Sequence, residues 1–98
     1  MVDMIEPVTP GELLKEEFLE PLGISHYRLA KETGIPAQRI GQIVLGRRAI
    51  TADTDLRLCK FFWLSDGYWL RVQAAYDTEI TCRKIAPELE CIKRFKKH

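Results

Sequence analysis

Apolar residues recur three and four positions apart along most of this chain, which is the spacing of one buried face on an α-helix. The stretches with this spacing are separated by short segments that contain glycine, proline and helix-capping residues. The pattern predicts an all-α fold with five helices. We expect a single domain over residues 1–98, with a flexible arm at 1–8, a helical core at 9–84 and a C-terminal extension at 85–98.

The segment at residues 25–48, SHYRLAKETGIPAQRIGQIVLGRR, predicts two short helices joined by a tight turn. Ser25 is a good N-cap, because its hydroxyl can accept a hydrogen bond from the first turn. Gly34 falls where the first helix must stop, since glycine takes a left-handed conformation at little cost. Pro36 suits the start of the second helix, where its missing amide hydrogen is not needed. The second helix has one apolar stripe, made of Ile40, Ile43 and Val44.

The second of these helices keeps a short polar face with few acidic residues. Its members are Ala37, Gln38, Arg39, Gly41 and Gln42, and Arg47 and Arg48 follow the helix directly. A helix-turn-helix needs such a face, because its second helix lies in the major groove with its N-terminal residues at base edges. Glutamine can pair bidentately with adenine and arginine with guanine. The alternative is an ordinary helical hairpin with a solvated polar face.

The first helix is predicted upstream of this pair. Thr9 and Glu12 form a capping-box pattern at its start, and Pro21 and Gly23 are expected to close it near residue 20. Its apolar positions are Leu13, Leu14, Phe18, Leu19 and Leu22. We expect the Phe18 face to pack on the helix pair described above.

Two more helices are predicted downstream of the pair. Thr51 caps the fourth helix, and Asp53 and Asp55 lie in its first turn, where negative charge suits the helix dipole. Its core-facing positions are predicted to be Leu56, Cys59 and Phe62, or Phe62 with Leu58. Ser65 is expected to cap a fifth helix that runs to about Lys84.

The chain after this fifth helix is harder to assign. Pro87 argues against one uninterrupted helix to the end of the chain. Residues 88–98, ELECIKRFKKH, are compatible with a short helical turn, a strand or a basic tail.

Charge is distributed unevenly, although the whole chain has a formal net charge of only +1. Residues 1–25 carry six acidic side chains and one lysine, whereas residues 26–48 carry five basic side chains and one glutamate. The segment proposed to read DNA is therefore basic, as expected of a phosphate-binding surface, and its N-terminal neighbour is acidic. The alternative is that patchy charge is simply common on small proteins.

Composition favours a folded globular chain, with 46% hydrophobic and 30% charged residues. No apolar run approaches the roughly 18 residues of a membrane span, and no signal peptide is evident, so we expect a cytoplasmic protein. The three cysteines, Cys59, Cys82 and Cys91, have no CxxC spacing and do not predict a disulfide framework. Cys59 is expected to be a small core residue.

The sequence shows no constellation of catalytic residues. His26 and His98 supply no metal-ligand spacing, and there are no paired catalytic carboxylates, no Ser–His–Asp or Cys–His arrangement and no glycine-rich phosphate loop. We therefore expect no enzyme activity, no metal and no cofactor.

Several motifs, in linked order and spacing over about residues 9–77, resemble one known family. They are TPGELLKEEFLEPLGIS, then LA-x-x-TGIPAQRI-x-QI-x-x-GRRAIT, then RLCKFF, then YWLRVQAAYD. This set is similar to the HigA branch of the xenobiotic-response-element helix-turn-helix family, whose members are antitoxins of addiction modules. The resemblance implies a five-helix, lambda-repressor-like DNA-binding domain, a homodimer, repression of its own operon and neutralisation of a HigB-type toxin, a RelE-like mRNA endonuclease. A stand-alone helix-turn-helix regulator without a toxin partner is the alternative.

The resemblance also implies roles for individual residues. The positions that match the base-facing positions of the family are Ala37, Gln38, Arg39 and Gln42. Those that match positions near phosphates are Ser25, Arg28, Arg47 and Arg48, although Arg28 is equally well placed for an ion pair with Glu32.

Two protein partners are expected. The apolar stretch from Trp69 to Ile80 exceeds what one short helix needs, which predicts a two-fold dimer interface in the fifth helix and the segment after it. A RelE-like toxin is typically basic, as the resemblance implies, so its antidote should present an acidic surface. We therefore expect much of the toxin contact on the N-terminal arm and the first helix, with Glu16, Glu17 and Glu20 as its residues, unless these glutamates are only a solvated face.

Overall fold

The computed structural model of the protein describes residues 7–96, and every regular element in that range is helical. The prediction of an arm at 1–8 falls mainly on residues 1–6, which lie outside the described residues. The elements in chain order are α1 (Pro10–Leu13), η1 (Leu14–Leu19), α2 (Glu20–Leu22), α3 (His26–Thr33), α4 (Ala37–Val44), α5 (Ala52–Phe62), α6 (Tyr68–Lys84) and α7 (Ala86–Glu90). The all-α prediction is confirmed.

The elements α1, η1 and α2 follow one another without a break, and the middle one is a π-helical segment. The predicted capping box is present, because the Glu12 N–H donates to Thr9 Oγ1 and the Thr9 N–H donates to Glu12 Oε1, both at 3.0 Å. Gly23 closes the helical run, as predicted, with a φ of +65°, but Pro21 does not end it, so the run continues to Leu22. The wider π turn directly before Pro21 accommodates a ring that clashes with a regular α-helix.

The pair α3 and α4 forms as predicted. The Arg28 N–H donates to Ser25 Oγ at 3.0 Å at the start of α3, and Gly34 ends α3 with a φ of +79°. The apolar residues of the pair are buried at Leu29, Ile35, Ile40 and Ile43. Gly11 allows α1 to approach α4 closely, because a Cβ at that position would lie 1.9 Å from the Ile43 carbonyl oxygen.

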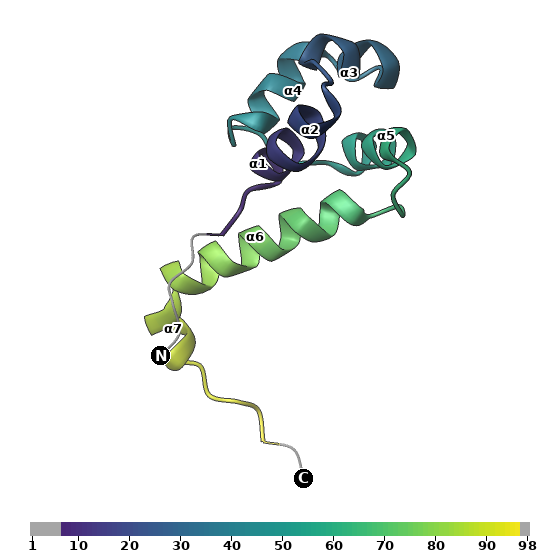
Figure 1. Cartoon of the computed structure of the whole chain (residues 1–98). Helices are drawn as coiled ribbons and strands as arrows, with labels where there is room; N and C mark the ends of the chain where they lie inside the picture. Colours follow the sequence, from purple (N-terminus) through teal and green to yellow (C-terminus); the bar gives the residue numbers. More distant parts are fainter. Residues whose placement is uncertain (1–6, 97–98) are drawn as a thin grey trace.

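The α1–η1–α2 run lies between the α3–α4 pair and the α5–α6 pair (Figure 1). The ring of Phe18 contacts the rings of Phe62 and Trp69, with centroids 4.9 and 5.0 Å apart, and the edge of Tyr68. The first helical run packs on the helix-turn-helix pair, as predicted, through contacts of α1 with α4, while the ring of Phe18 itself has its aromatic partners on α5 and α6. These aromatic contacts join the first helical run to the C-terminal half of the core.

The fourth helix, α5, begins at its predicted cap, where the Thr54 N–H donates to Thr51 Oγ1. Leu58 and Cys59 are buried, as expected, but Leu56 is 49% exposed, so that part of the prediction is wrong. Positions 56 and 58 both fit a helical repeat with Phe62, and the packing of α6 selects the second one.

The fifth helix, α6, does not begin where its sequence predicted. Ser65 is not its cap, and α6 begins at Tyr68 after Gly67, whose φ is +90°. The capping group is the buried carboxylate of Asp55, whose Oδ2 accepts from the Gly67 N–H and whose Oδ1 accepts from the Trp69 N–H, both at 2.8 Å. Asp55 thus caps the N-terminus of the next helix, in addition to lying in the first turn of its own.

The turn between α5 and α6 exposes an aromatic side chain. Trp63 ends α5 with a φ of +60°, a left-handed conformation that costs a non-glycine residue about 1 kcal/mol or more. Its side chain is nevertheless 95% exposed. Six residues later, Trp69 is completely buried in the core.

The second half of α6 projects from the rest of the molecule and carries α7 at its end (Figure 1). The predicted break is confirmed, because α6 stops at Lys84 and Pro87 is the second residue of α7. The Cα radius of gyration is 16.8 Å, larger than the value of about 13 Å expected for a compact chain of this length. Residues 92–96 have no regular structure.

Candidate nucleic-acid interface

The N-terminal turn of α4 presents Ala37 and Gln38 to solvent. Pro36 precedes the helix in an extended conformation, no side chain caps the first turn of α4, and that turn contains no acidic residue. One turn later, a Cβ built on Gly41 has no neighbour within 4 Å, which leaves open space over the helix backbone. A small, exposed, partly positive helix end of this kind can approach base edges in a major groove.

Arg39 lies on the same helix but is directed elsewhere. Its guanidinium Nη1 is 3.6 Å from Asp53 Oδ2 on α5, and its side chain is only 29% exposed. Asp53 also binds the Nε of Arg57 at 3.1 Å. The structure therefore separates Arg39 from Ala37 and Gln38, and a contact of Arg39 with a base requires release from Asp53.

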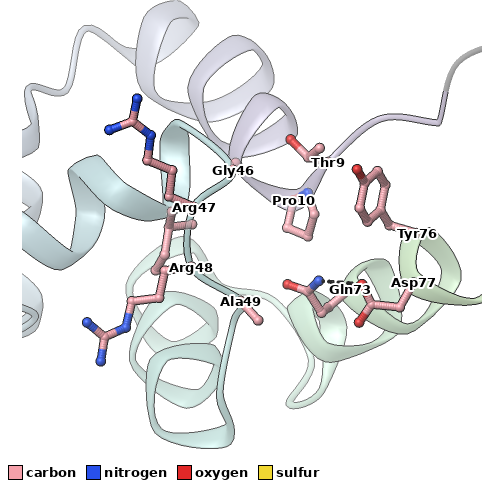
Figure 2. A pocket seen from close by; sticks show the side chains of 11 residues that line it. Thr9, Pro10, Gly46, Arg47, Arg48, Ala49, Gln73, Tyr76 and Asp77 are labelled. Carbon is pink, nitrogen blue, oxygen red and sulfur yellow. Dashed lines mark hydrogen bonds between the residues drawn. The ribbon is translucent and has the colours of Figure 1, made fainter. Parts of the chain in front are cut away.

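The basic loop, which we define as residues 45–50, follows α4. Gly46 adopts a φ of +75°, and the Arg47 N–H donates to the Gln42 carbonyl oxygen at 2.8 Å, which turns the chain back at the end of the helix. Arg48 Nη1 donates to the side-chain Oε1 of Gln42 at 3.2 Å, so these two predicted site residues are in direct contact. Arg47 and Arg48 are exposed, and their side chains point away from α6 (Figure 2).

The start of α3 holds the two remaining residues of the predicted DNA site. The Ser25 hydroxyl is occupied as an N-cap, and the Arg28 Nε donates to Glu32 Oε2 at 3.0 Å. The intrahelical pair that was one alternative for Arg28 is therefore present. The pair is exposed and of low net strength, so it leaves the guanidinium able to exchange partners.

Gln73 of α6 contributes to this region although no sequence signal singled it out. Its Oε1 accepts from the Ile50 N–H at 2.9 Å, and its Nε2 donates to Asp77 Oδ1 at 3.0 Å. Beside it, a pocket of about 240 Å³ lies between the basic loop, the start of α1 and α6, and Tyr76 is part of its wall (Figure 2). The only hint in the sequence was the four-residue spacing of Gln73 and Asp77 on a helix.

The predicted toxin-contact residues lie on the first helical run. Glu16 and Glu17 are exposed on η1, and Glu20, on α2, is 3.5 Å from Lys15 Nζ with both side chains more than half exposed. The π-helical turn displaces these glutamates from a regular helical register.

Cys59 is a core thiol, and it does not resemble a reactive or metal-binding one. Burial is the main factor that raises the pKa of the Cys59 thiol, and its hydrogen bond to Asp55 acts in the same direction. Within residues 7–96 no group of three His, Cys, Asp or Glu side chains is arranged to hold a metal ion. None of the helices described in the same range is long and apolar enough to cross a membrane.

Comparison with known proteins agrees with this geometry. A family model described as Helix-turn-helix matches residues 15–68. Virulence-associated protein I of Dichelobacter nodosus is 45% identical over 73 residues, which make up 74% of this chain and 68% of that protein.

Two solved structures extend the likeness to nearly the whole fold. An addiction module antidote protein of the HigA family from Coxiella burnetii is 39% identical, with a TM-score of 0.86 over 93% of this chain and 100% of that one. Antitoxin HigA of Pseudomonas aeruginosa, solved with the higBA promoter, is 30% identical, with a TM-score of 0.85 over 92% of this chain and 99% of that one. The chain belongs to the helix-turn-helix proteins and, among them, to the HigA family of addiction-module antidote proteins.

Proposed function

We propose that this protein is the DNA-binding antitoxin of a HigBA-type module, which acts in the cytoplasm, represses its own operon and neutralises a RelE-like mRNA endonuclease. The observation that carries the proposal is the exposed N-terminal face of α4, together with the exposed arginines of the basic loop that follows the helix. The Pseudomonas aeruginosa relative was solved with promoter DNA, and its fold is shared here at a TM-score of 0.85.

Base reading is assigned to α4. Gln38 is exposed at the end of the helix that enters the groove, and Gln42 lies one turn further along the same face. Arg48 holds the Oε1 of Gln42, which fixes the direction in which that amide points. Ala37 lets the helix approach the bases closely because its side chain is small. Arg39 can contact a base only after its ion pair with Asp53 breaks.

Phosphate binding is assigned to Arg47, Arg48, Ser25 and Arg28. The two loop arginines are exposed and follow the reading helix directly, and the other two lie at the start of α3. Such contacts fix the orientation of the protein on the duplex and make its affinity dependent on salt.

A homodimer is assigned to the projecting half of α6 and to α7. Ile80, Leu89 and Ile92 are exposed there, and a hollow of about 450 Å³ lies over Cys82, Ile85 and Leu89. A second copy related by a two-fold axis covers such a surface and places two reading helices on a palindromic operator, with half-sites roughly 34 Å apart.

Toxin binding is assigned to the acidic surface of Glu16, Glu17 and Glu20. These side chains are exposed on a helical run that does not contribute the DNA-facing residues. An acidic surface suits a basic nuclease, and charge complementarity accelerates and orients association.

Operator binding tests the DNA role. Gln38→Ala and Gln42→Ala should each relax base preference at one operator position, at a cost of about 1–3 kcal/mol. Arg47→Ala should weaken binding to all sequences and reduce the salt slope by about one. Lys60→Ala, an exposed basic change on α5, is the matched control and should leave the slope unchanged. Operator discrimination that survives both glutamine changes would remove α4 as the reader.

Toxin affinity tests the partner. The triple change Glu16→Lys, Glu17→Lys and Glu20→Lys should weaken binding to the candidate toxin while operator binding persists. The matched comparison reverses Glu79, Glu88 and Glu90, which are exposed on α6 and α7, with the dimer shown intact by sedimentation because these residues lie on the elements assigned to the homodimer. Loss of affinity in this comparison variant alone would move the toxin site to the C-terminal half. A chain that binds its operator but no toxin encoded beside it would instead be a stand-alone regulator.

A further inference from the structure

We propose that Gln73 is a positioning residue for DNA binding, because it connects the basic loop to α6 and holds the loop in the orientation that phosphate contact requires. This inference rests on the proposed DNA-binding function. It adds a residue of α6 to a site whose other members lie on α3, on α4 and in the basic loop.

The hydrogen bond to Gln73 fixes the end of the basic loop. Ile50 is 4% exposed, so its side chain is held in the core, and its N–H donates to Gln73 Oε1 at 2.9 Å. The start of the loop is fixed at α4, where the Arg47 N–H donates to the Gln42 carbonyl oxygen at 2.8 Å. The two arginines therefore lie on a short segment that is fixed at both ends.

The Gln73 side chain that accepts from Ile50 lines a pocket between the basic loop and α6. The pocket of about 240 Å³ lies between residues 46–49 of the loop and Tyr76 of α6, so close packing against α6 does not hold that part of the loop, and only its end at Ile50 is packed in the core (Figure 2). Gln73 extends from α6 to Ile50 beside this pocket. A directional contact of this kind defines the loop position where side-chain packing does not.

Asp77 sets the direction of the Gln73 amide. Its Oδ1 accepts from Gln73 Nε2 at 3.0 Å, so the amide nitrogen faces Asp77 and the amide oxygen faces Ile50. A carboxylate accepts hydrogen bonds and cannot donate them when ionised, so the reverse orientation of the amide is disfavoured. The pair therefore presents an acceptor, and not a donor, to the basic loop.

The first test removes the side chain. Gln73→Ala should accelerate amide hydrogen exchange at Ile50 in the free protein and weaken binding to operator and to unrelated DNA alike. We expect about a 3- to 10-fold change in each, the size of one neutral hydrogen bond. Gln38→Ala is the matched control, because it should alter operator discrimination and leave exchange at Ile50 unchanged.

The second test exchanges the two polar partners. Gln73→Glu alone places a carboxylate beside Asp77 and should weaken DNA binding by repulsion and added negative charge. Combination with Asp77→Asn restores both the net charge and the hydrogen bond, since the introduced carboxylate accepts from Ile50 and from the introduced amide. The double variant should return exchange at Ile50 and DNA affinity to within about 2-fold of the parent, an outcome that a merely destabilising change does not give.

The outcomes separate this inference from the function on which it rests. If Arg47→Ala weakens DNA binding but Gln73→Ala does not, the DNA role stands and the positioning role is wrong. If Gln73→Ala accelerates exchange at Ile50 but neither Gln73→Ala nor Arg47→Ala weakens DNA binding, the contact exists and the assignment of the basic loop to phosphate is wrong. Failure of the double variant to recover exchange at Ile50 also overturns the inference.

Discussion

The two halves of α6 belong to the same helix but have opposite surroundings. In the first half, Trp69 is completely buried, its backbone N–H donates to Asp55, and Gln73 is bound to the basic loop. In the second half, Ile80 is 36% exposed and Cys82 is exposed. Helical structure is thus maintained across both halves, while the fully buried side chain of α6 and its hydrogen bonds to α5 and to the basic loop lie in the first.

The difference separates the part of the helix that serves the fold from the part that we propose for the dimer interface. The first half is held by contacts that cross from α5 and from the basic loop, so its removal should unfold the chain. The second half projects from the rest of the molecule and contributes no residue to the buried core cluster of the described residues. Most of the stability of a helix in a protein comes from packing, so the proposed dimer should stabilise the second half in the way that the core stabilises the first.

The largest expected effect comes from truncation in the first half. Trp69→Ala should reduce the free energy of unfolding by about 4 kcal/mol, because a buried indole in contact with Phe18 and Tyr68 leaves a large cavity. Chemical denaturation of the monomer measures the change. Ile80→Ala, in the second half, should cost less than about 1 kcal/mol under the same conditions. Equal losses would remove the distinction between the two halves.

The cap between α5 and α6 gives the next effect. Asp55→Ala leaves three N–H groups at the start of α6 without their acceptor and should cost about 3 kcal/mol. Asp55→Asn keeps one acceptor oxygen and should cost less. Asp53→Ala is the control, since its ion pairs are exposed and its loss should cost under about 1 kcal/mol. A similar cost at positions 53 and 55 would contradict the assignment of the cap.

A third change should act on association and leave the monomer fold intact. Ile85→Asp combined with Leu89→Asp introduces two charges into the apolar hollow of the second half. Sedimentation should show a dimer dissociation constant raised by at least about 10-fold, while unfolding of the monomer changes by no more than about 0.5 kcal/mol. A dimer that survives the double change would place the two-fold interface elsewhere.

The smallest perturbation is chemical and alters no residue in the sequence. Cys82 and Cys91 are exposed, whereas Cys59 is buried and its pKa is raised by that burial, so Cys59 has less of the reactive thiolate near neutral pH. Iodoacetamide should therefore label Cys82 and Cys91 in the native protein. Mass spectrometry should find label at Cys59 only after unfolding. Early labelling of Cys59 would contradict its position in the core.

The parts of the fold that were predicted correctly depend on contacts near in sequence. Ser25 caps an amide three residues away, and Gly34 ends its helix by its own backbone conformation, so both are visible in a local pattern. Asp55 caps amides 12 to 15 residues further on, and Gln73 binds an amide 23 residues before it. No periodicity records such a contact, which is why Ser65 was expected to cap the helix that Asp55 caps.

In the candidate site, too, features that depend on local sequence were predicted and contacts between elements were not. The polar face of α4 was evident from the spacing of Ile40, Ile43 and Val44, and the structure confirms which side of the helix is buried. The ion pair of Arg39 with Asp53 and the contact of Gln42 with Arg48 were not evident, because each depends on where a neighbouring element lies. The roles of these residues with DNA stay predictions.

The opposite environments of the two tryptophans provide an internal optical probe. Trp63 is 95% exposed in the turn after α5, and Trp69 is completely buried six residues later. Iodide should quench the emission of the first and leave that of the second unaffected, so one spectrum of the unlabelled protein reports separately on the surface and on the core. A ligand that covers the turn would protect Trp63 from quenching, and loss of the core would shift the emission of Trp69 to longer wavelength.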